Sequence, residues 1–271
     1  MDITKYLDTW AAAYRNDLIE NIMPFWMKFG LDRKHGGIYT CLDRDGKLMD
    51  STKSVWFQGR FGFIASYAYN HIEKKQEWLA ASKSCIDFIE THCTDIDGHL
   101  FFEVTEEGIP LRKRRYVFSE CFAAIAMSEY AIASGDKSYA TKALEIFKRT
   151  LKFLSTPGFL EPKYLPTLQS RGPSITMILI NTASRIREVI EDPVLDRQIN
   201  ESLTSIRQYF MHPEFKALLE MVGPKGELID TCNGRTINPG HCIETSWFIM
   251  EEARHRNWDK DLVQLALQIL D

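Results

Sequence analysis

Features that mark several common functional classes are scarce in this sequence. The 271 residues carry a net charge of −4 and have a pI near 6.0, whereas nucleic-acid-binding proteins usually present a clustered basic face. One basic run, Arg112-Lys113-Arg114-Arg115, is short, and a solvated loop is sufficient to explain it. We therefore expect no nucleic-acid partner.

Long apolar runs and paired cysteines are also missing. No stretch approaches the roughly 20 apolar residues of a membrane span. The polar residues Asp2, Lys5 and Asp8 follow Met1, so we expect neither a membrane segment nor a signal peptide. The six cysteines lack Cys-x-x-Cys spacing, which favours free buried thiols over disulfides or a zinc site. These patterns predict a cytoplasmic protein without a bound metal.

Helical periodicity dominates the sequence instead. Apolar residues recur at three- and four-residue steps, beginning with a stripe over 4–28. Short loops such as 134–136 alternate with longer, hairpin-like loops. This alternation favours an all-α ring of helical hairpins in one domain, 1–271, over an open solenoid. We expect about nine helices, at 4–28, 52–72, 77–92, 117–133, 138–154, 173–190, 194–211, 240–256 and 259–270, and hairpins at 37–46, 98–108 and 219–231.

The segment 233–244 holds the strongest candidates for chemistry. Pro239-Gly240 before an apolar run predicts a helix start that places His241 in the first turn. The positive end of the helix dipole disfavours an imidazolium there, so we expect a neutral His241 that accepts a proton. Glu244 lies three residues on, within reach of the other ring nitrogen. A capping histidine beside a solvated glutamate fits the same spacing.

A second candidate, Arg60, lies among aromatic residues. Trp56, Arg60 and Phe63 share one helix face. The donors of an arginine in a polar cavity suit sugar oxygens or a developing enolate. Alternatively, the aliphatic part of Arg60 packs on Trp56 while its charge reaches water.

Two further charged residues have structural explanations of their own. Glu120 lies at the start of an apolar helix, where a negative charge is stabilising without any substrate. Arg171 precedes Pro173, which starts another helix, and a solvated loop cation explains it. Both residues remain candidates for substrate contact.

Together these segments resemble the N-acylglucosamine 2-epimerase family. The matching strings occur in the family's order and span nearly the whole chain. They are Lys53-Ser-Val-Trp-Phe-Gln-Gly-Arg60, Phe118-Ser-Glu-Cys-Phe122, Met177-Ile-Leu-Ile-Asn181 and Asn238-Pro-Gly-His-Cys-Ile-Glu244. The resemblance implies an (α/α)6-barrel with catalytic His241, Glu244 and Arg60. It also implies substrate contacts from Trp56, Gln58, Glu120, Arg171 and Met177.

The resemblance further implies a reaction, the interconversion of N-acetylglucosamine and N-acetylmannosamine. The sugar ring opens, a base removes the proton at C-2, and a second acid returns a proton to the opposite face. The family's second histidine lies beyond Asp271, and the helical pattern at 259–270 stops without a cap. We therefore expect the C-terminal part of the barrel to be missing from this chain.

The resemblance also bears on cofactors and partners. It implies an amino sugar as the small-molecule substrate, no required cofactor, ATP as an allosteric activator, and a homodimer. Three alternatives stay open. They are an epimerase or isomerase of unacylated sugars such as mannose or cellobiose, a non-catalytic binding protein, and a glycoside hydrolase or lyase on the same fold.

Overall fold

The computed structural model describes residues 2–113 and 116–271. The expected solvated loop at 112–115 therefore includes two residues, Arg114 and Arg115, that lie outside the described ranges. Two compact units are present: unit 1 comprises Met1–Arg114 and Phe122–Ala143, and unit 2 comprises Arg115–Cys121 and Leu144–Asp271. The single domain over 1–271 stays a prediction.

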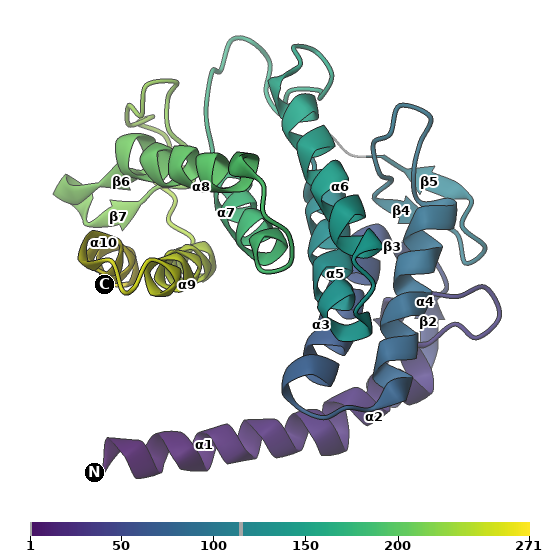
Figure 1. Cartoon of the computed structure of the whole chain (residues 1–271). Helices are drawn as coiled ribbons and strands as arrows, with labels where there is room; N and C mark the ends of the chain where they lie inside the picture. The colour runs from purple at the N-terminus through teal and green to yellow at the C-terminus, as the bar shows by residue number, and fades with distance from the viewer. Residues whose placement is uncertain (1, 114–115) are drawn as a thin grey trace. The chain divides into compact units, whose positions relative to one another are not determined.

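Helices make up most of both units (Figure 1). Each helical stretch expected from the apolar periodicity is present, with ends shifted by only a few residues. In chain order they are α1 Ile3–Asp17, η1 Leu18–Ile22, α2 Met23–Phe25, η2 Trp26–Gly30, α3 Val55–His71, α4 Gln76–His92, α5 Phe118–Ser134, α6 Ser138–Ser155, α7 Ser174–Arg187, α8 Pro193–Ser205, η3 Ile206–Phe210, η4 Pro213–Phe215, α9 Pro239–His255 and α10 Lys260–Leu270.

The first helical stretch continues from α1 through η2, but its apolar stripe is only partly packed. In α1, Tyr6, Leu7, Trp10 and Tyr14 are 45%, 59%, 46% and 69% exposed. Packing begins in η1 and α2, where Met23 joins Ala65, Ala68 and Trp78 in a buried cluster. Periodicity alone therefore predicted the helix but not which of its turns are covered.

The centre of unit 1 is the hairpin of α3 and α4, with part of α5 against it. The hydroxyl of Ser66 donates to Ser82, which donates to the carbonyl of Gly62, so the helices are joined by buried hydrogen bonds. A Cβ at Gly59 would lie 2.6 Å from the backbone carbon of Phe122. Glycine at this position therefore permits the close approach of α3 and α5.

Unit 2 contains two further hairpins, α7 with α8 and α9 with α10, and α7 also packs on α9. Its core is aliphatic, with Ile186, Leu195 and Ile249 fully buried. The buried carboxylate of Glu252 accepts from Arg187 and Arg256, each at 2.6 Å. The hydrogen bonds from both partners offset the cost of burying this charge inside the unit.

Short strands form small hairpins at the helix connections. Two of the expected loops contain them, and their turns use glycines with positive φ, 87° at Gly46 and 94° at Gly108. In the third, at 219–231, an isolated bridge joins Val222 to Leu228. The strands are β1 Cys41–Leu42 with β2 Leu48–Asp50, β3 Lys53–Ser54 with β4 Glu103–Val104 and β5 Pro110–Arg112, and β6 Met211–His212 with β7 Ala217–Leu218. The β6–β7 hairpin is too short to have been predicted.

All six cysteines are free thiols. Cys85, Cys93, Cys121 and Cys242 are buried as expected, whereas Cys41 and Cys232 are exposed. Burial raises the pKa of the Cys93 thiol to about 12. In the described ranges, no helix has the length and apolar character needed to cross a membrane.

Candidate functional site

His241 lies at the start of α9, as the Pro-Gly signal predicted. Asn238 caps the helix, and its side-chain oxygen accepts from the backbone N–H of His241 at 3.3 Å. The imidazole Nδ1 lies 2.9 and 3.0 Å from the two carboxylate oxygens of Glu220. A carboxylate only accepts hydrogen bonds, so Nδ1 carries the proton and Nε2 is the ring nitrogen left for chemistry.

The expectation that Glu244 holds the other nitrogen of His241 is therefore wrong. Glu220 occupies that position instead. The side chain of Glu244 is half-buried and forms no hydrogen bond or ion pair within the described part of the chain. Spacing along a helix predicts which residues share a face, but a loop folded against that face can supply the nearer partner.

Glu220 lies on a loop fixed by its backbone. Its N–H donates to the carbonyl of Thr236 at 3.2 Å, and Leu219 donates to Phe210 at 3.0 Å. Two residues on, Val222 exchanges backbone hydrogen bonds of 2.8 and 3.0 Å with Arg171. The loop before α7 and the start of α9 thus meet through this segment, which brings two predicted site regions together.

The guanidinium of Arg171 does not point at the His241 pair. It stacks over the ring of Tyr209, 4.1 Å from the ring centre. Its backbone supports the Glu220 loop, while its side chain is exposed. The structure therefore gives Arg171 a supporting position, and its contact with a substrate stays a prediction.

The thiol of Cys242, next to His241, does not act as a second base beside the imidazole. Burial, and then the negative charge of Glu220, raise the pKa of its thiol above the ordinary value. The thiol therefore stays neutral near pH 7.

In unit 1, Arg60 lies on the exposed side of α3. Its guanidinium is 4.3 Å from the ring centre of Phe122 and 5.8 Å from that of Phe57. Arg60 lines a pocket of about 400 Å³ together with Tyr39, Thr40 and mainly apolar side chains. Trp56 packs edge-on against Phe102 and Phe122. Aromatic rings thus hold the exposed Arg60 beside a mainly apolar pocket.

Gln58 has a different role from the predicted substrate contact. It is fully buried, and its amide accepts from the N–H of Ile38 at 2.8 Å and donates to the carbonyl of Ile38 at 2.7 Å. A Cβ at Gly37 would lie 2.5 Å from its oxygen. Gln58 therefore clamps the first loop onto α3.

Lys53, at the head of the same motif, is a structural residue that was not recognised as a candidate. Its ammonium group is fully buried and donates to Asp32 at 2.6 Å. It also donates to the carbonyls of Gly36 and Glu106. One buried charge therefore ties three segments together around the base of α3.

Glu120 and Met177 are both buried in unit 2, 0% and 4% exposed. Glu120 lies in the first turn of α5, consistent with stabilisation of that helix start. Met177 is one of the buried residues of α7. Their predicted contacts with a substrate stay predictions.

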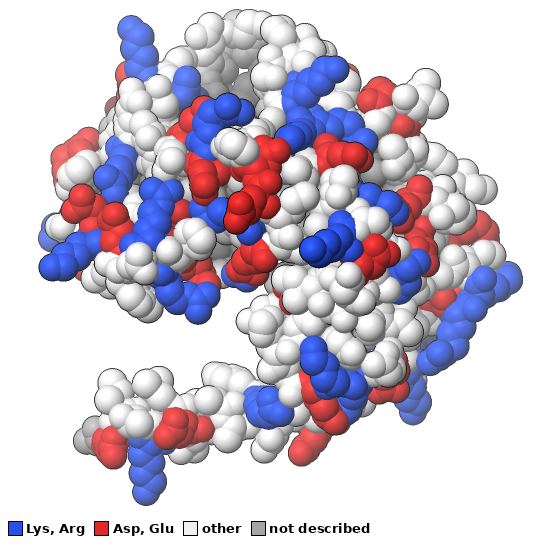
Figure 2. All heavy atoms as spheres, viewed as in Figure 1, with Lys and Arg blue, Asp and Glu red and all other residues white. Residues whose placement is uncertain are grey.

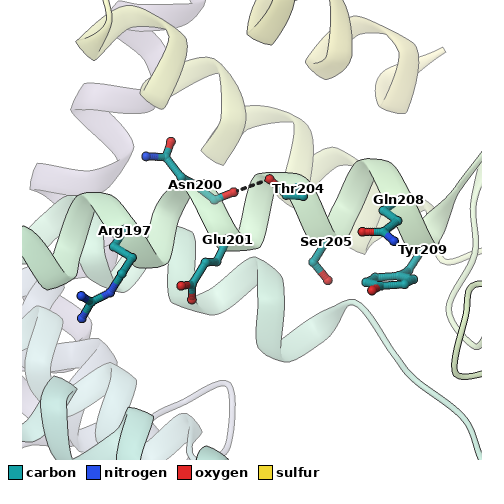
Figure 3. Close-up of a pocket in the computed structure, with 7 residues that line it drawn as sticks. All are labelled: Arg197, Asn200, Glu201, Thr204, Ser205, Gln208 and Tyr209. Carbon is teal, nitrogen blue, oxygen red and sulfur yellow. Dashed lines mark hydrogen bonds between the residues drawn. The ribbon is translucent and has the colours of Figure 1, made fainter.

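The surface also carries a polar hollow and mixed charges. A hollow of about 660 Å³ follows α8 and η3, lined by polar side chains such as Arg197, Glu201 and Tyr209 (Figure 3). Acidic and basic groups are interspersed on the face shown in Figure 2. Within the described ranges, no three His, Cys, Asp or Glu residues are grouped to hold a metal ion.

Residues 37–271 match the family described as N-acylglucosamine 2-epimerase (GlcNAc 2-epimerase). The N-acylglucosamine 2-epimerase of Rattus norvegicus is 29% identical over 255 residues, 91% of this chain and 60% of its own length. A cellobiose 2-epimerase of Ruminococcus albus is 31% identical over 51% of this chain and 35% of its own. The chain spans 58–64% of the length of the mammalian relatives that it matches.

Among solved structures, cellobiose 2-epimerase from Bacillus thermoamylovorans B4167 superposes with a TM-score of 0.85 at 21% identity, covering 97% of this chain and 71% of that one. At this identity the likeness concerns the fold. It confirms the expected class, an all-α fold of the (α/α)6-barrel type.

Proposed function

Because the chain belongs to the N-acylglucosamine 2-epimerase family, we propose that it interconverts N-acetylglucosamine and N-acetylmannosamine. The reaction exchanges the configuration at C-2 of the open-chain sugar, next to the aldehyde. That position is acidic enough for a protein base because the carbanion is delocalised onto the carbonyl oxygen as an enolate.

The observation that carries this proposal is the orientation of His241. With Nδ1 held by Glu220 at 2.9 Å, Nε2 is the nitrogen that removes the proton from C-2. In this proposal Arg60 donates hydrogen bonds to the enolate oxygen, where charge develops. A second acid returns a proton to the opposite face.

The test follows solvent exchange at C-2. The protein is incubated with N-acetylmannosamine in deuterated water, and proton NMR records the loss of the C-2 signal and the appearance of N-acetylglucosamine. Deuterium at C-2 of the product is the expected result. Interconversion without deuterium, or cleavage instead of inversion, would contradict proton transfer through solvent-exchanging groups.

A second candidate substrate class is the unacylated sugars. The relationship to a cellobiose 2-epimerase over 51% of the chain favours its inclusion. Cellobiose, mannose and glucose are therefore assayed in parallel under the same conditions. Exchange with these sugars but not with the N-acetyl sugars would keep the chemistry and change the substrate.

We also propose a location, an activator and an oligomeric state for the enzyme. We propose a cytoplasmic location, which the six free cysteines support. ATP activation and a homodimer follow from the family alone. Rates with and without ATP, and the mass in solution, test them directly.

A further inference from the structure

The loop residue Glu220 carries an inference that rests on the proposed function and goes beyond it. We propose that Glu220 is the positioning residue of the reaction. It selects the Nδ1–H tautomer of His241, directs Nε2 toward the substrate, and balances the charge that His241 acquires when it takes the proton.

The first support is geometric. Both carboxylate oxygens lie within 3.0 Å of the same ring nitrogen, at 2.9 and 3.0 Å. A hydrogen on Nδ1 therefore has an acceptor in either half of the carboxylate. The hydrogen bond to the ring is kept even if the carboxylate rotates slightly. In the alternative tautomer, the Nδ1 lone pair would face two carboxylate oxygens. This arrangement disfavours the alternative tautomer strongly.

The second support is the rigidity of the loop that carries Glu220. The flanking residues Leu219 and Met221 are buried, 3% and 7% exposed, and the backbone of Glu220 is bonded to Thr236. The backbone that carries the carboxylate is thus held by contacts other than the hydrogen bonds to His241. A partner held in advance costs little reorganisation when the proton moves.

The third support is electrostatic. The start of α9, a 17-residue helix, presents the positive end of its dipole to His241, which opposes the formation of an imidazolium. The Glu220 carboxylate acts in the other direction and is itself stabilised by that helix end. The side chain of Glu220 is 20% exposed, against 35% for His241. The carboxylate is therefore the more sheltered partner, and the base the more accessible one.

Two variants separate positioning from charge. Glu220→Gln keeps an oxygen that accepts from Nδ1–H but removes the charge. Glu220→Ala removes both. The nitrogen signals of the His241 ring, recorded by ¹⁵N NMR near neutral pH, report the tautomer directly and do not depend on turnover. Glu227→Gln is the matched control, because Glu227 is an exposed carboxylate of the same loop that bonds to the backbone of Lys225.

The wild type is expected to show a protonated Nδ1 and a bare Nε2. Glu220→Ala should lose this bias and slow C-2 exchange by about 100-fold, with a smaller change in KM. Glu220→Gln should keep the tautomer and slow exchange by about 10-fold through the lost charge. Glu227→Gln should leave both measurements unchanged.

Two results would overturn the proposal: a bare Nδ1 in the wild type, or a Glu220→Ala variant with wild-type kcat and an unchanged tautomer. Failure of the proposed function looks different. In that case the wild-type chain exchanges no sugar while the nitrogen signals still decide whether Glu220 sets the tautomer. If Glu220→Ala does not fold, the Glu220→Gln signals and rate decide the proposal.

Discussion

Unit 2 contains two histidine–carboxylate pairs with nearly the same geometry and opposite surroundings. In each, Nδ1 lies about 3 Å from a glutamate oxygen, at 2.9 Å for His241 and Glu220 and 3.0 Å for His212 and Glu214. The His241 side chain is 35% exposed and its partner 20%. The His212 side chain is 11% exposed and its partner 59%.

This difference determines what each pair can do. The ring of His212 is stacked against Phe215 and is the more buried partner of its pair, while its carboxylate faces water. At His241 the carboxylate is sheltered and the second nitrogen is accessible. A histidine therefore becomes a candidate base when its carboxylate partner is more buried than the imidazole. The distance between imidazole and carboxylate does not distinguish the His241 pair from the His212 pair.

The largest effect is expected at His241. His241→Ala should lower the rate of C-2 exchange by about 10²- to 10⁴-fold, because it removes the base. Since the side chain is one third exposed, we expect little change in the free energy of unfolding. Exchange rates from NMR and urea unfolding curves measure the two quantities separately.

His212→Asn is the matched change and should behave in the opposite way. Loss of a buried, hydrogen-bonded ring costs about 1–3 kcal/mol of stability, with C-2 exchange within about threefold of the wild type. Equal rate losses in the two variants would show that the comparison between the pairs is wrong.

Lys53 and Asp32 form a fully buried ion pair, which extends the comparison to the stability of the protein. Lys53→Met should lower the free energy of unfolding by about 3–5 kcal/mol, because it leaves a buried carboxylate without its partner. Lys47→Met, at an exposed lysine of the neighbouring hairpin, should change it by less than about 0.5 kcal/mol. A Lys53→Met variant as stable as the control would show that the pair is dispensable.

The buried Lys53–Asp32 pair also predicts that the free energy of unfolding depends on pH. Burial raises the pKa of Asp32, but the hydrogen bond from Lys53 and the backbone N–H groups of His35 and Lys34 outweigh it and hold the pKa below the ordinary value. This stabilisation is complete above the pKa of the unfolded chain, about 3.9. It is lost as the pH falls through the folded-state value. Unfolding curves from pH 7 to pH 2 should show this loss in the wild type and a smaller one in Asp32→Asn.

The helices were predictable because their signals are local. The apolar repeat and the Pro239-Gly240 start depend on neighbours within a few residues. Glu220 and His241 are 21 residues apart, and they meet because the loop at 219–222 pairs with Arg171. The available signal was a single charge inside the apolar run Leu218-Leu219-Glu220-Met221-Val222.

The pairing predicted for Glu244 depended on a shared helix face and the contact predicted for Gln58 on the family resemblance, and tertiary packing gave both side chains other surroundings. Gln58 faces the first loop, where Ile38 uses both ends of its amide. Glu244 shares a helix with His241, but the nearer carboxylate comes from a loop. Periodicity determines which residues point the same way, and it contains no information about which segment covers that face.

A smaller effect on the reaction is expected in unit 1. Arg60→Ala should slow the chemical step by about 10²- to 10³-fold, as for the loss of one donor to a developing oxyanion. Arg60→Lys should recover part of this rate, because it keeps the charge without the planar pair of donors. The single-turnover rate constant measures the chemical step. Equal rates for the wild type and Arg60→Ala would place the enolate contact elsewhere and leave the His241 pair as the remaining candidate.

The smallest effect is expected at Glu214. Its own backbone N–H, and then His212, lower the pKa of this exposed carboxyl, so its contribution exists above the ordinary glutamate value and is lost as the pH falls through the folded-state value. Glu214→Gln should therefore leave C-2 exchange unchanged and lower the thermal midpoint only slightly at pH 7, and this difference from the wild type should disappear as the pH falls through the folded-state pKa of Glu214. Exposed ion pairs contribute little because water screens them. A rate loss in Glu214→Gln as large as that in Glu220→Gln would mean that shelter of the carboxylate is not what distinguishes the two pairs.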